Sequence, residues 1–137
     1  MAINSKSEEI YEALKSYLQE QSQYNPIVLD NVIDNKYPLV VFETNTNNLE
    51  SITQDRYRLN QVRNLSFEIS VFAVNINDTS SIDICEEISN YICEVMNVYY
   101  GMQGGIDAKL KNINTAKATK YVLHFNCMWN VRHNIIY

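Results

Sequence analysis

The chain of 137 residues lacks every short motif that signals a common enzyme site. It has no G-x-G-x-x-G or Walker loop for nucleotides, no H-E-x-x-H helix for zinc and no C-x-x-C pair. Only two histidines are present, His124 and His133. Metal sites need clusters of histidine, cysteine and carboxylate, so we expect no metal site, no cofactor and no catalytic residue.

Long apolar runs are also missing. None approaches the 18 residues that would predict a membrane-spanning helix. The N-terminal stretch is acidic early and has no apolar core, which is unlike a secretory signal. Cys85 and Cys93 fall on one predicted helix, roughly 12 Å apart, which is too far for a disulfide. We therefore expect buried free thiols and a cytoplasmic protein.

Basic charge is scarce, with 11 Lys and Arg against 16 Asp and Glu and a net charge of −5. Broad electrostatic binding to nucleic acid needs a basic face, so this balance argues against it. The chain is 46% hydrophobic and 20% charged, which is ordinary for a globular domain, and its length predicts a single domain over residues 1–137. Ten tyrosines indicate either an interface or simply a strand-rich fold.

Two amphipathic helices are predicted from apolar residues at helical spacing. The first covers residues 6–21, and the polar stretch before Pro26 ends it. The second covers residues 81–100. It begins with Ser80 and Asp83 at capping-box positions and ends before Gly101. Its acidic residues Glu86, Glu87 and Glu94 fall on the outer side, where a solvated face is expected rather than a metal site.

Strands are predicted at residues 39–44, from residue 64 to about 76, at 108–118 as an edge strand, and at 120–131. Residues 27–37 are compatible with either a short strand or irregular structure. The order of elements predicts an α+β fold, in which an antiparallel sheet of about four strands has two helices packed on one face. One core is expected to contain Phe67, Ile69, Val71, Ile88, Ile92, Leu123, Phe125 and Trp129.

The segment from residue 45 to about 61 is predicted to be a long arm between the first and second strands. It lacks the glycine and proline of a tight turn at its distal end. Arg and Tyr are enriched at interface hot spots, so contact with another subunit is the favoured interpretation. Contact with nucleic acid and a mobile surface loop are the alternatives. The candidate interface residues are Asp55, Arg56, Tyr57, Arg58 and Arg63.

Two further sets of residues, a cysteine with a histidine and a pair of glycines, are of types found in active sites or phosphate-binding sites. Cys127 and His124 are three residues apart in a predicted strand and so point to opposite faces, which argues against a nucleophilic pair. Gly104 and Gly105 are not followed by a helix, so a turn is expected there rather than a phosphate site.

The order of these elements resembles that of the tail terminator, or tail completion, proteins of tailed bacteriophages and phage-tail-like particles. The resemblance extends over nearly the whole chain. It rests on element order, on length and on the phrases YPLVVFET, RNLSFEISVFAVN and YVLHFNCMWNV. Neck, head-completion and minor capsid proteins have similar size and composition, and a monomeric α+β protein-binding adaptor is a further alternative.

The resemblance implies a structural protein without enzymatic activity. It would form a homo-oligomeric ring, typically a hexamer, that caps the tail tube and joins the tail to the head or neck. Its partners would be further copies of itself, the tube protein, and possible sheath and neck or head-completion proteins, and DNA would only pass through the ring. The location would be the bacterial cytoplasm during assembly and then the tail or neck of the particle. The arm would contact a neighbouring subunit or the tube.

Overall fold

A computed structural model describes residues 5–30, 36–54, 59–106, 113–115, 118–130 and 135–136. Its elements in chain order are α1 (Ser5–Gln21), β1 (Ile27–Asp30), β2 (Leu39–Gln54), β3 (Leu59–Ala73), α2 (Ser81–Cys93), the π-helical segment η1 (Glu94–Tyr99), β4 (Gln103–Ile106), β5 (Ile113–Thr115), β6 (Ala118–Asn130) and β7 (Ile135–Ile136).

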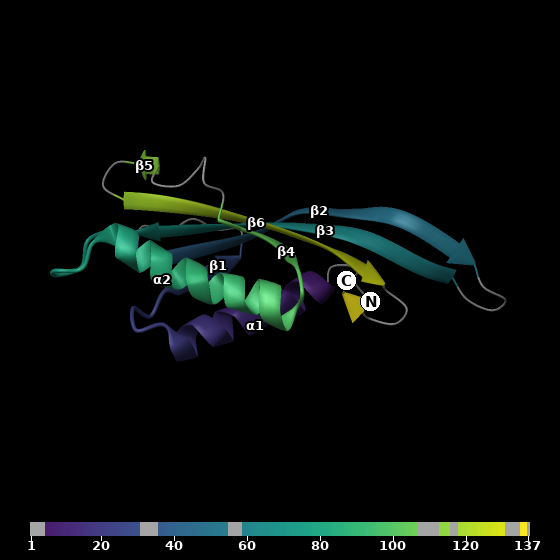
Figure 1. Cartoon of the computed structure of the whole chain (residues 1–137), viewed down its shortest axis with the longest axis horizontal. Helices are drawn as coiled ribbons and strands as arrows, with labels where there is room; N and C mark the ends of the chain where they lie inside the picture. The colour runs from purple at the N-terminus through teal and green to yellow at the C-terminus, as the bar shows by residue number, and fades with distance from the viewer. Residues whose placement is uncertain are drawn as a thin grey trace.

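The strands form one sheet with the order β1-β2-β3-β6-β4, and β5 and β7 also pair with β6. Every pair is antiparallel except β1 with β2. Both helices lie on the same face of the sheet (Figure 1). The predicted α+β fold is confirmed. The described residues form seven strands, whereas about four were predicted. The three additional strands, β1, β4 and β7, are too short for a clear sequence pattern.

A single core lies between the sheet and the helices. The alternating residues of β3 and β6 enter it from the sheet, and one side of each helix enters it from the other layer. All eight residues predicted for the core belong to this cluster. The contribution of α1 to this core is Ile10, Leu14 and Leu18, which are spaced four residues apart and are all fully buried.

The second helix begins as predicted, because the Ser80 side chain accepts a hydrogen bond from the backbone N–H of Asp83 at 3.2 Å. Its last part differs. From Glu94 onward the backbone is π-helical, and the N–H of Tyr100 donates to the carbonyl of Val95. Gly101 then ends the helix with φ +67°, the left-handed conformation expected after a helix.

A second, smaller buried group lies on the face of the sheet away from the helices. Val41, Ser70 and Val122 are register partners across β2, β3 and β6, and all three are buried. Their neighbours in sequence point into the main core, so this row faces the other way.

The structure corrects the prediction of a long loop over residues 45–61, because most of these residues belong to strands. Residues 45–54 continue β2, and β3 begins at Leu59 rather than at residue 64. The two strands pair from Leu39 with Phe72 as far as Gln54 with Leu59. Many residues of this region are polar and have low strand propensity, but pairing with β3, interrupted only at Asn45 and Glu50, extends the strand beyond what propensity predicts.

Candidate assembly surface

The end of the β2–β3 pair extends beyond the rest of the sheet. Pairing of β3 with β6 stops at Val62 and Asn130, whereas pairing of β2 with β3 continues to Gln54 and Leu59. We call Thr46–Gln54 of β2, together with the paired residues Leu59–Ser66 of β3, the distal hairpin. It reaches past the ends of α2 and β6 (Figure 1). Backbone pairing therefore continues in this hairpin beyond the last residue of β3 that pairs with β6.

Of the predicted interface residues, Arg63 lies in the distal hairpin. It is half-buried, and its register partners are Leu49 on one side and Trp129 on the other. The other four, Asp55, Arg56, Tyr57 and Arg58, lie outside the described residues. Their position in the chain places them between Gln54 and Leu59, which are paired with each other. The sequence therefore puts two arginines and a tyrosine between the ends of a paired hairpin.

The outer edge of β2 is open in the part of the chain that the structure describes. On this side β1 pairs only with Leu39–Phe42, and no described strand continues from there to Gln54. Two irregularities in the pairing with β3 leave Asn45 and Glu50 without a register partner. Between them, Thr46–Leu49 is a regular stretch of strand.

The opposite edge of the sheet is divided among three short strands. β5, β4 and β7 pair in turn along β6. Gly104 is required there, because a Cβ at this position would lie 2.0 Å from the carbonyl oxygen of His124. Short edge strands are a usual way to prevent pairing with another chain. The two edges of this sheet are therefore very different.

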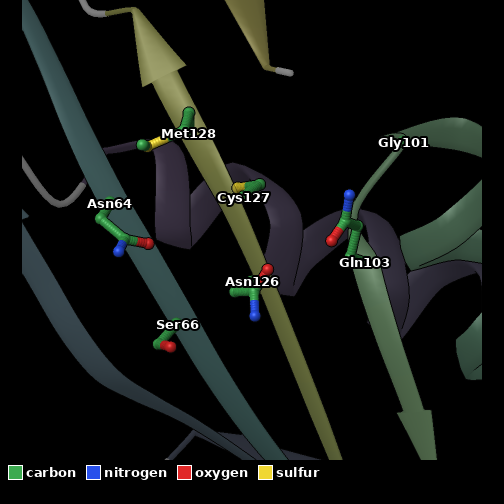
Figure 2. Close-up of a pocket in the computed structure, with 7 residues that line it drawn as sticks. All are labelled: Asn64, Ser66, Gly101, Gln103, Asn126, Cys127 and Met128. Carbon is green, nitrogen blue, oxygen red and sulfur yellow. The ribbon is translucent and has the colours of Figure 1, made fainter.

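A shallow pocket of about 330 Å³ opens where β4 meets β6. Its polar side chains come from β3, β4 and β6 (Figure 2). Ser66, Asn126 and Gln103 are register partners in one row, and Asn64 lies in the next row. The lining consists of amide and hydroxyl groups with Met128, Gly101 and Cys127, and it contains no ionised side chain. Such a surface can form hydrogen bonds but offers no acid, base or activated nucleophile.

The sulfur of Cys127 is not prepared for chemistry. Burial raises the pKa of its thiol to about 11, although the charge of Lys6 acts in the opposite direction. A thiol with this pKa is protonated at neutral pH and is a poor nucleophile. His124, three residues earlier, instead lies beside Glu68 at 3.7 Å on the face away from the helices. The predicted separation of Cys127 from His124 is confirmed.

The acidic residues of α2 bond to other elements, which the sequence did not predict. Glu87 accepts hydrogen bonds from Ser22 at 2.9 Å and from Gln23 at 2.8 Å, so it links α2 to the end of α1. Glu86 accepts from the buried Tyr121 hydroxyl at 3.0 Å. Burial, followed by this hydrogen bond, raises the pKa of Tyr121. The helical spacing of these glutamates shows which side of α2 they occupy but not which residues of other elements they contact.

Aromatic residues gather where α1 meets η1. Tyr17 makes edge contacts with Tyr91 and Tyr99 at ring distances of 6.0 and 5.7 Å. Tyr99 and the adjacent Val98 remain 63% and 71% exposed. A hydrogen bond to Glu94 is the largest cause of the raised pKa of Tyr17. Tyr17, Tyr91 and Tyr99 thus contribute to the packing of α1 against α2 and η1.

The described helices include none long and apolar enough to cross a membrane. Among the same residues, no group of three or more His, Cys, Asp or Glu side chains is arranged to hold a metal ion. No protein-family model matches the chain, and a search of curated proteins also found no match. The surface features above are therefore the basis for any functional proposal.

Proposed function

We propose that this chain is the structural subunit of a ring that caps the tail tube of a phage or phage-tail-like particle and joins the tail to the head or neck. The observation that carries the proposal is the distal hairpin, which projects from the sheet and has Arg56, Tyr57 and Arg58 between its paired ends. The resemblance in element order supplies the type of assembly.

The charges support contact between copies. The chain carries a net charge of −5, so the positive charges of Arg56 and Arg58 would be attracted to a second copy, which is negative overall. A head-to-tail contact of this type, repeated by rotation, closes into a ring. The ring would contact the tube protein and its neck or sheath neighbours, and DNA would pass through it.

The test is a tail-capping assay with purified protein and tails that lack a terminator. Replacing Arg56, Tyr57 and Arg58 together by alanine should abolish capping, which would leave tubes of irregular length or tails that do not join heads. If these residues act in assembly and not in folding, the melting temperature should stay within a few degrees. Electron microscopy of tail lengths and thermal unfolding are the two measurements.

A matched control replaces the exposed Lys36, Asn90 and Asn97 by alanine, and this variant should cap normally. Normal capping by the Arg56/Tyr57/Arg58 variant would remove the hairpin from the mechanism. Failure of the unaltered protein to cap any tail would overturn the proposal. Tail-free binding to another neck or capsid component would then favour a neck or minor capsid protein, and a strictly monomeric protein with a soluble partner would favour an adaptor.

A further inference from the structure

Among the described strands, β2 has the longest edge without a paired neighbour. From Glu43 to Gln54 no described strand pairs with this side. In an extended strand, backbone N–H and C=O groups alternate between the two sides, so about half of those in this stretch point away from β3. An open edge of this length is a ready template for another strand.

We propose that this edge pairs with the same edge of a second copy, so that two β2 strands run antiparallel through a two-fold axis and two sheets become one. The proposed contact is centred on Thr46–Leu49, the regular stretch between the two irregularities at Asn45 and Glu50. The partner is a second copy of this chain, and the interaction is made mainly by backbone hydrogen bonds.

Length favours a second copy of the same edge. The other side of the sheet offers only β5, β4 and β7, with three, four and two residues. None of these matches the open part of β2. A second β2 edge is equal in length by definition, and one isologous contact covers both open edges at once.

Geometry favours it as well. A two-fold axis perpendicular to the sheet reverses the direction of β2 and leaves each face on its own side. The two copies therefore meet as antiparallel strands, and both pairs of helices remain on the same face of the joined sheet. The core faces of the copies are continuous, and no buried surface is turned toward solvent.

Charge does not oppose the pairing. The stretch Thr46–Leu49 is uncharged, and the nearest charges in β2 are Glu43 and Glu50. In a pairing centred on Asn47, Glu43 lies opposite Ser51 and Glu50 lies opposite Thr44. In a pairing centred on Asn48, Glu43 lies opposite Thr53 and Glu50 lies opposite Thr46. These residues carry no charge, so no like charges face each other.

This contact is separate from the ring proposed above. A two-fold contact is complete with two copies and cannot be repeated around a ring, whereas a ring needs a head-to-tail contact. The pairing therefore describes the protein before it meets a tail, and its success or failure is measured without tails.

The first experiment is native mass measurement of the purified chain at tens of micromolar. The unaltered protein should have the mass of two copies. The Asn47→Lys/Asn48→Lys variant should have the mass of one, because lysines disfavour pairing at an edge and the central residue would face its own copy. The matched Asn90→Lys/Asn97→Lys variant, with both changes on exposed helical positions, should remain a dimer. Circular dichroism should show all three folded.

The second experiment locates the axis. In a symmetric pairing the central residue lies directly opposite itself at a Cα distance of about 4.5–5.5 Å, which suits a disulfide. Either Asn47→Cys or Asn48→Cys should therefore cross-link to a dimer on mild oxidation, whereas Asn90→Cys should not. A monomeric unaltered protein would overturn the proposal, as would a dimer that survives Asn47→Lys/Asn48→Lys or a pair of cysteine variants that both fail to cross-link.

Discussion

At the scale of single residues, Gly104 shows how closely β4 approaches β6. Its φ is +133°, and an added Cβ would also meet the Cα of Phe125 at 2.8 Å. Both the backbone conformation and the space exclude a side chain. The neighbouring Gly105 has no atom within 4 Å of the same point. Two adjacent glycines thus have different roles, which their sequence context does not distinguish.

We expect Gly104→Ala to lower the free energy of unfolding by at least about 2 kcal/mol, since it combines backbone strain with a clash against main-chain atoms. Gly105→Ala is the matched control and should change it by less than about 1 kcal/mol. Urea unfolding of both variants measures the difference. Equal effects of the two changes would contradict the described pairing of β4 with β6.

The buried thiols make stability depend on alkaline pH. Burial, as the largest cause, raises the pKa of Cys85 to about 12 and that of Cys127 to about 11, from an ordinary value of 9.0. In the unfolded chain both thiols ionise near pH 9, whereas in the folded chain they stay protonated. The unfolded state then binds fewer protons, so stability falls as the pH rises above 9.

At pH 10 this effect should cost about 1 kcal/mol for each thiol relative to pH 8. Denaturant unfolding at the two pH values measures it. The Cys85→Ala/Cys127→Ala variant should show a smaller loss between the same pH values, whatever its absolute stability. The remaining loss would come from Cys93 and from tyrosines such as Tyr121, because burial also raises the pKa of these groups. An unchanged loss in the variant would refute the assignment to the thiols.

At the scale of elements, α2 depends on one apolar side that contacts β3 and β6. Ile92 is fully buried in the core, whereas Ile82 on the same helix is 45% exposed. Ile92→Ala should therefore cost about 2–5 kcal/mol of unfolding free energy, through lost burial and a cavity. Ile82→Ala should cost less than about 1 kcal/mol. Thermal or urea unfolding compares the two, and similar losses would mean that the buried side of α2 is misassigned.

The sequence predicted the elements whose pattern is set by burial. The alternation in β3 and β6 and the helical spacing in α2 each record which side faces the core, so their type and the eight core residues could be inferred. The distal hairpin has polar residues on both strands and carries no such record. Its two strands are paired through their backbones as far as Gln54 and Leu59, and a ladder of this kind leaves no apolar pattern in the sequence.

At the scale of the whole molecule, the candidate site was only partly predictable. The candidate interface residues were chosen from the sequence by residue type, and of these only Arg63 lies among the described residues, in β3. It could not show that β2 has an open edge, because an edge is a relation among strands far apart in the chain. The same reason hides the polar pocket, whose side chains come from β3, β4 and β6. Relations between strands become visible only when their register is known.

The register also determines the order in which the fold can form. β2 and β3 are consecutive and join through a short local connection, whereas Phe67 pairs with Phe125, about 60 residues later in the chain. Closing so large a loop costs more entropy than closing a hairpin, so contacts of this kind slow folding. We therefore expect refolding to be limited by the arrival of β6 beside β3. Changes at the distal hairpin would leave the refolding rate nearly constant, and changes such as Phe125→Leu would slow it.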